Sequence, residues 1–220
     1  MTKDIPQPII DAFEELLASN DKDRAHAWSA LAGAVGFDGS KFDMDGDLHH
    51  TQVRAAVLAC AAHFVQTDKA GAAYIDHPRR VHAIARDLSL PSGSFSAEEV
   101  DAALCAALLH DVVEDSGDDF YRQITLADLS TLGFSALTVE LVRLLTFDKS
   151  QAKVDYLRAI AANPLARLVK LADTCDNMNR KRQAALGEEK RAEFSGRYGN
   201  YMQVLDFDPA TKWFADSINS

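Results

Sequence analysis

Apolar residues recur at helical spacing over most of this 220-residue chain, and no stretch alternates apolar and polar residues in the manner of a strand. Ala-rich helical segments with short connections are typical of an all-α bundle. The pattern predicts a first helix at residues 9–17 and a second helix that begins after a capping residue at position 20 or 21. Further helices are predicted at residues 48–65, 78–90, 96–116, 125–131, 135–145, 151–162, 164–178 and 188–205, and a last short helix around residues 213–214.

A loop rich in Gly and Asp, GFDGSKFDMDGD at residues 36–47, separates the first two predicted helices from the rest. The second of these two helices carries Trp28 and Leu31, and the pair reads as a helical hairpin. We therefore expect an N-terminal helical extension over residues 1–47 and a main domain over residues 48–220.

The central predicted helix contains the stretch Ala102–Ser116, AALCAALLHDVVEDS, which ends an apolar run with His110, Asp111, Glu114 and Asp115. At about 100° per residue on a continuous helix, these four side chains share one side. Burying such a cluster without a cation costs several kcal/mol or more per charge, at an order-of-magnitude estimate. A bound divalent metal would compensate that cost, whereas the alternative is an amphipathic helix that ends at the surface. The stretch alone leaves both interpretations open.

Two further segments place ionisable groups where a core is expected. In LARLVKLADTCDNM, Asp173 follows a run of apolar residues and Asn177 lies one turn later. In YIDHP, His77 stands directly before a proline that suits the first turn of a helix. Taken singly, Asp173 could form a salt bridge to a nearby cation, and His77 could be a surface histidine.

The overall charge limits the partners of the chain. A formal net charge of -10 argues against a broad basic surface for nucleic-acid polymers, but a small anionic ligand needs only a few local cations. The three cysteines lack CxxC spacing and suggest neither a disulfide framework nor a thiolate zinc site. Neither a signal peptide nor a membrane span is indicated, so we expect a soluble, cytoplasmic protein.

The three segments YIDHP, LLHDVVEDS and KLADTCDNM, in this order and spacing, resemble the HD-type hydrolase domains of the RelA/SpoT homologues, including the small alarmone hydrolases. The resemblance spans residues 53–205 and leaves the N-terminal hairpin outside. An HD dipeptide alone is common, but HDVVED together with an upstream HP and a downstream LAD and NM is far more specific.

The resemblance implies an all-α HD-domain bundle and one divalent metal, expected to be Mn²⁺. It implies that the metal ligands are His77, His110, Asp111 and Asp173. Glu114 and Asp115 then resemble the pair that activates the attacking water, and Asn177 resembles a substrate-contacting residue. The implied reaction removes pyrophosphate from the 3′ position of guanosine tetra- or pentaphosphate (ppGpp or pppGpp) to yield GDP or GTP.

The chain departs from its relatives mainly in the loop QTDKAGAA before YIDHP, where only Lys69 supplies a cation. The residues after LAD also differ, being Thr174, Cys175 and Asp176. We expect Lys69, Tyr74, Lys149 and Asn177 to contact the substrate. These departures leave three hypotheses open: a ppGpp hydrolase, a hydrolase for another nucleotide such as an adenosine alarmone or a nucleoside phosphate, and a non-catalytic HD module that binds a nucleotide or a protein. The oligomeric state is not indicated.

Overall fold

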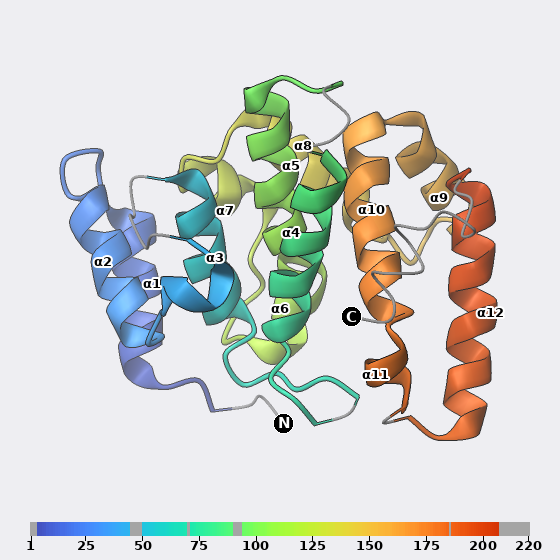
Figure 1. Ribbon diagram of the computed structural model, residues 1–220. Coiled ribbons are helices and arrows are strands. Elements are labelled where there is room, and N and C mark those ends of the chain that lie inside the picture. Colours follow the sequence, from blue (N-terminus) through green and yellow to red (C-terminus); the bar gives the residue numbers. More distant parts are fainter. Residues whose placement is uncertain (1–3, 45–49, 70, 90–93, 185, 207–220) are drawn as a thin grey trace.

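In the computed structural model, which describes residues 4–44, 50–69, 71–89, 94–184 and 186–206, the chain folds as a bundle of α-helices (Figure 1). Within these residues the only β-type pairing is an isolated bridge between Thr67 and Ala73. The predicted all-α class is therefore confirmed. No helix in the described part of the chain has both the length and the apolar character needed to cross a membrane. The last predicted helix, around Trp213 and Phe214, lies outside the described residues.

The helices lie close to the positions that the hydrophobic pattern predicts. The hairpin of α1 and α2 lies at one end of the molecule, and α9 and α12 lie at the opposite end (Figure 1). The bounds are α1 Gln7–Ala18, α2 Arg24–Ala34, the 3₁₀ helix η1 Gly39–Phe42, α3 Thr51–Ala62, α4 Asp76–Ser89, α5 Ala97–Leu109, α6 Val112–Asp119, α7 Leu126–Thr131, α8 Ala136–Leu145, α9 Lys153–Ala162, α10 Pro164–Asn177, α11 Arg180–Ala184 and α12 Glu188–Val204.

Helix α5 is the centre of the bundle. Every residue from Ala102 to Leu109 is buried, and α5 packs against α3, α4, α8 and α10. The small alanine side chains on α5 and α3 allow these helices to pack tightly against their neighbours. This packing is what places the end of α5 beside α4 and α10.

Local sequence sets where the key helices begin. Ser96 and Glu99 form a capping box at the start of α5. Helix α10 begins with Pro164 in its first turn, and the side chain of Asn163 accepts hydrogen bonds from the backbone N–H groups of Leu165 and Ala166. Helix α2 is an exception, because it begins at Arg24 rather than directly after Asn20 or Asp21, and its N-cap residue Asp23 makes no side-chain capping bond.

The central predicted helix is not continuous, which corrects the sequence-based expectation. It ends at Leu109, and His110 and Asp111 form a turn before α6 begins at Val112. Asp111 has φ −100° and ψ −9°, away from ideal helical values, while Asp115 N–H still bonds to the Asp111 carbonyl. The helix is therefore interrupted at the two residues expected to be metal ligands.

The N-terminal hairpin packs onto the main body through aromatic side chains. Phe13 of α1 meets Phe120 edge to face at 5.3 Å between ring centroids, and Trp28 of α2 meets Phe134 at 6.3 Å. Arg24 also donates a hydrogen bond to the Thr131 carbonyl. The hairpin and the body thus share one continuous hydrophobic core.

Candidate metal centre and pocket

Three helices bring the chemistry-bearing segments together. His77 lies in the first turn of α4, His110 directly follows α5, and Asp173 lies in α10. All three side chains are buried, and their potential ligand atoms lie within 4.8 Å of one another. Helix α4 packs closely against both α5 and α10, which explains how residues nearly a hundred positions apart meet.

Both imidazole rings present Nε2 to the same point. His110 donates from Nδ1 to the Ala107 carbonyl at 2.9 Å, and His77 donates from Nδ1 to the Asp176 carboxylate at 2.6 Å. Each Nε2 is therefore available as a ligand. The Nε2 atom of His110 is buried and has no hydrogen-bond partner.

Two carboxylates complete the cluster. An Asp111 oxygen lies 3.0 Å from His110 Nε2 and 3.7 Å from His77 Nε2, and an Asp173 oxygen lies 3.3 Å from His77 Nε2. Tyr74 donates its hydroxyl hydrogen bond to Asp111 at 2.5 Å. A set of two imidazole nitrogens and two carboxylate oxygens suits a divalent transition metal. The residues present therefore fit a divalent metal ion, as the resemblance implies.

Asp173 is held by its own helix. Lys170 donates to one carboxylate oxygen at 2.7 Å, and Asn177 donates to the other at 2.6 Å. Burial opposes ionisation of Asp173, but the Lys170 charge and the hydrogen bond to His77 outweigh it and hold the pKa of Asp173 well below its usual range. Asp173 thus forms a salt bridge with Lys170 and also belongs to the buried cluster.

Without a metal, the surrounding carboxylates favour the protonated form of His77. Burial disfavours the charged ring, but hydrogen bonds to Asp173 and Asp176 outweigh burial and raise the pKa of His77 to about 9. A divalent cation at Nε2 would supply the same positive charge to the surrounding carboxylates, so cation binding and protonation compete for this atom.

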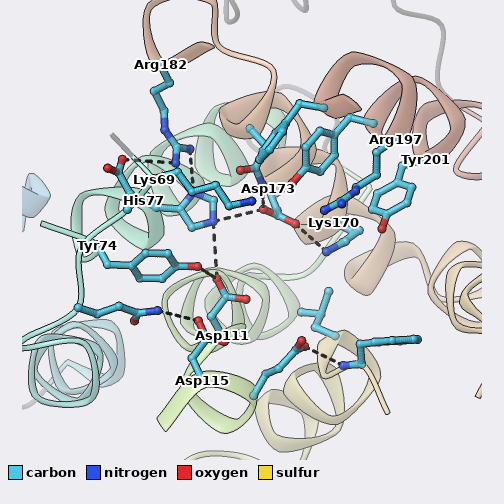
Figure 2. Close-up of a pocket in the computed structure, with 18 of the residues that line it drawn as sticks. Lys69, Tyr74, His77, Asp111, Asp115, Lys170, Asp173, Arg182, Arg197 and Tyr201 are labelled. Atoms are coloured by element: carbon cyan, nitrogen blue, oxygen red, sulfur yellow. Dashed lines mark hydrogen bonds and ion pairs between the residues drawn. The ribbon is translucent and has the colours of Figure 1, made fainter. Parts of the chain in front are cut away.

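His77, Asp111 and Asp173 of this cluster line a pocket of about 450 Å³. Figure 2 shows Tyr74 reaching Asp111 from one side, with Lys170, Arg197 and Tyr201 on the opposite side. The wall combines cations and aromatic rings with the two carboxylates of α6. Its residues come from the loop before α4, the loop before α9, and α6, α9, α10, α11 and α12, and they include Lys69, Tyr74, Glu114, Asp115, Phe147, Lys153, Tyr156, Lys170, Asn177, Arg182, Phe194, Arg197, Tyr198 and Tyr201.

The two carboxylates after the HD dipeptide have different surroundings. Glu114 is exposed and accepts a hydrogen bond from the Phe147 backbone N–H at 3.0 Å. Asp115 is half-buried and accepts from the Gln66 side chain at 3.0 Å. Burial, followed by the negative charge of Asp111, raises the pKa of Asp115 to about 6. Both groups line the pocket, as expected from the sequence.

Several pocket cations rest on aromatic faces. Lys153 lies 3.8 Å from the ring centroid of Phe147, and Lys69 lies 4.3 Å from that of Phe194. Burial lowers the pKa of both lysines. Of the expected substrate contacts, Lys69, Tyr74 and Asn177 line the pocket; Lys149 is exposed in the loop before α9, and Lys153 lines the pocket instead.

Residues 74–178 match the family model described as the HD domain. The chain contains an HD domain. This domain holds His77, His110, Asp111, Glu114, Asp115, Asp173 and Asn177, whereas Lys69 lies just before it.

The HD domain also has a counterpart among solved structures. One such structure, described as a metazoan ortholog of SpoT that hydrolyses ppGpp and plays a role in starvation responses, aligns with a TM-score of 0.56 and 27% sequence identity, covering 76% of this chain and 93% of that chain. No curated protein sequence matches the chain. The two matches confirm the resemblance inferred from the sequence motifs and support the expected enzyme class, a metal-dependent phosphohydrolase.

Sequence reasoning missed several residues around the HD-domain site. Asp176 is buried against His77, although the sequence offered it only as a departure from relatives. Arg182 of the short helix α11 and Arg197 of α12 also reach the pocket. Helical spacing on α12 could have indicated a common face for Phe194, Arg197, Tyr198 and Tyr201, but nothing local predicts which pocket that face meets.

Proposed function

We propose that this chain is an Mn²⁺-dependent hydrolase that removes the 3′-diphosphate of ppGpp or pppGpp, giving GDP or GTP and pyrophosphate. The observation that carries the proposal is the unpartnered, buried Nε2 of His110, which faces a second imidazole and two carboxylates that line a pocket rich in cations. Similarity to a structure described as a ppGpp-hydrolysing SpoT ortholog supports the choice of substrate. A cytoplasmic location and a small nucleotide as substrate belong to the same proposal.

The proposed ligands of the metal are His77, His110, Asp111 and Asp173. When bound, a divalent ion supplies positive charge that neutralises phosphate oxygens and lowers the pKa of water at the site. Neighbouring side chains hold the proposed metal ligands in place. Tyr74 donates a hydrogen bond to Asp111, and Lys170 donates one to Asp173. Such outer contacts orient ligands and tune their basicity.

The proton acceptors in the proposal are Glu114 and Asp115. As water attacks the phosphorus bonded to the ribose 3′ oxygen, one of these carboxylates accepts the proton that the water loses. The bond from that phosphorus to the 3′ oxygen breaks, pyrophosphate leaves, and the 3′ oxygen takes a proton. The separate surroundings of the two carboxylates place one at the rim and the other deeper in the pocket.

The pocket wall provides the substrate contacts of the proposal. Lys69 and Lys153 are the proposed phosphate contacts, because each has its ammonium group on an aromatic face and lines the cavity. Asn177 and Tyr74 are the proposed contacts close to the metal. Lys149 stays a predicted contact only for a substrate that extends beyond the pocket.

A second candidate, a hydrolase for another nucleotide, is favoured by the loop before α4. This loop contributes one cation, Lys69, together with the negative charge of Asp68, and both side chains line the pocket. Arg182 lies 3.7 Å from Asp68, so part of the available positive charge is already paired. A base other than guanine is therefore the alternative to test.

The test is product identification after metal reconstitution. Protein stripped with a chelator and reloaded with Mn²⁺ should release pyrophosphate from ppGpp, leave GDP, and lose this activity without metal. The panel should include pppGpp, the 3′-diphosphate of ADP, GTP and ATP. Faster release from the adenosine compound would establish the second candidate. Full metal loading with nucleotide binding but no turnover of any compound would instead show a binding module.

A further inference from the structure

Asp176 is the most deeply buried carboxylate near the HD-domain site that the reaction scheme leaves unused. Its exposed fraction is 1%, and it lies on α10 close to one turn beyond Asp173. One carboxylate oxygen accepts from His77 Nδ1 at 2.6 Å, and the other accepts from Arg80 Nε at 2.6 Å. Arg182 donates to the same oxygen that His77 contacts. The carboxylate is thus fully partnered, and one of its partners is a proposed metal ligand.

The charges around Asp176 balance without a charged imidazole. Arg80 of α4 and Arg182 of α11 contribute two positive charges, and Asp176 and Asp68 contribute two negative ones, with Arg182 lying 3.7 Å from Asp68. A buried carboxylate with two guanidinium partners stays ionised, because protonation would leave Arg80 without its carboxylate partner. His77 Nδ1 therefore donates to an ionised carboxylate at 2.6 Å, which is closer than the Arg182 nitrogen at 3.2 Å.

We propose that Asp176 is a positioning residue that holds His77 in the Nδ1–H form, so that Nε2 is directed at the metal and its affinity for the metal is increased. The inference rests on the proposed metal centre. A carboxylate partner fixes ring orientation and raises the basicity of the opposite nitrogen. His110 offers an internal comparison, because its Nδ1–H bonds only to the neutral Ala107 carbonyl. We therefore expect Nε2 of His77 to be the stronger electron-pair donor to the metal of the two imidazoles.

The inference assigns a purpose to a departure from the resembling family. Asp176 is one of the residues after LAD that differ in this chain, and its partners Arg80 and Arg182 come from two other helices. The ion pairs of Asp176 with Arg80 and Arg182 connect α10 to α4 and α11 beside the proposed metal site. A purely structural role would stabilise this packing without altering the metal.

The experiment measures Mn²⁺ affinity of chelator-stripped protein, by the electron paramagnetic resonance signal of the free ion, for Asp176→Asn and Asp176→Ala. We expect each substitution to weaken affinity by about 10- to 100-fold, with alanine the more severe, because loss of an outer-shell partner typically has this effect. Asp128→Asn is the matched control, since Asp128 makes a two-point contact with Arg122 far from the pocket. It should change stability but leave Mn²⁺ affinity unchanged.

A second measurement does not depend on the variants folding. In unmodified protein loaded with diamagnetic Zn²⁺, nitrogen-15 NMR should show a proton on Nδ1 of His77 that exchanges slowly with water, and Nε2 bound to metal. A proton on Nε2 of His77 in the loaded protein would overturn the inference. Mn²⁺ affinity within twofold of normal in a folded Asp176→Asn protein would also overturn it, while leaving the proposed function standing. Absence of metal binding by unmodified protein would instead refute the proposed metal centre itself.

Discussion

Glu114 and Asp115 are neighbours in sequence, yet their side chains have different surroundings. Glu114 bonds to the backbone N–H of Phe147 and stays exposed at the rim of the pocket. Asp115 bonds to Gln66, whose carbonyl oxygen in turn contacts the buried ring of His63 at 2.5 Å. Asp115 is therefore the more buried of the two, and Glu114 is the more accessible to solvent.

Replacing Glu114 with Gln tests the proposed chemistry most directly. The amide keeps an oxygen for the Phe147 N–H but cannot accept the proton of water, so kcat should fall by about 10²-fold or more with Mn²⁺ still bound. Asp115→Asn should give a similar loss if the two carboxylates act as a unit. Pyrophosphate release and Mn²⁺ content should be measured on the same preparations. Near-normal turnover of both variants would remove these residues from the mechanism.

His82 gives the protein a pH-dependent stability away from the pocket. It is buried and contacts the Gln52 side-chain oxygen at 2.9 Å. Burial, and then the nearby Arg86 charge, lower the pKa of His82 to about 4. Because the unfolded chain binds this proton near pH 6.5, the unfolded state takes up more protons as pH falls. Stability from the neutral ring is thus complete above pH 6.5 and declines toward pH 4.

Comparison with His82→Gln isolates this contribution. Between pH 7.5 and 5.5, unmodified protein should lose about 1 kcal/mol more of its free energy of unfolding than the variant, as follows from the two pKa values. Urea denaturation of metal-free protein at several pH values provides the measurement. Parallel pH profiles for the two proteins would show that His82 titrates alike in both states.

At the same residue scale, the sequence predicted the metal-ligand residues better than it predicted which other side chains lie close to them. The family resemblance implied His77, His110 and Asp173 as metal ligands, and the structure brings these three side chains together. Lys149 and Lys153 could not be ranked, since their distances from the pocket depend on where α9 begins. Asp176 was missed because its partners Arg80 and Arg182 lie on other helices, which local periodicity does not report.

At the scale of elements, long helices with caps were predictable, while interruptions were not. The capping box at Ser96 and the proline at the start of α10 marked real helix starts. The turn at His110–Asp111 interrupts a stretch whose composition suits an unbroken helix, and tertiary packing of both residues overrides that local preference. The five-residue helix α11 is too short for a periodic pattern.

The start of α10 offers a test of how much a single cap contributes. Asn163 accepts from two backbone N–H groups there, and α10 carries both Asp173 and Asn177. Asn163→Ala should lower the free energy of unfolding by about 1 kcal/mol, as measured by urea denaturation. Asn163→Asp is the matched control, because it keeps an acceptor at the cap and should cost much less. Equal losses for Ala and Asp would show that the cap is not the cause.

At the scale of the whole molecule, the N-terminal hairpin is continuous with the core that carries the metal centre. The body contributes Phe120 and Phe134 to the aromatic contacts with α1 and α2, and Phe120 directly follows α6, the helix of Glu114 and Asp115. The sequence-based division at residue 47 rests on composition. Unfolding experiments test whether it is also a boundary of cooperative folding.

Trp28 answers that question, because it is fully buried on the hairpin and packs against the body. Trp28→Ala should destabilise the protein by about 3–5 kcal/mol. If hairpin and body unfold together, circular dichroism and loss of Mn²⁺ binding will shift to the same lower urea concentration in one transition. Trp28→Phe should shift both signals less, since it retains an aromatic ring beside Phe134. A first transition that removes helical signal but leaves Mn²⁺ bound would show that residues 1–47 unfold as a separate unit.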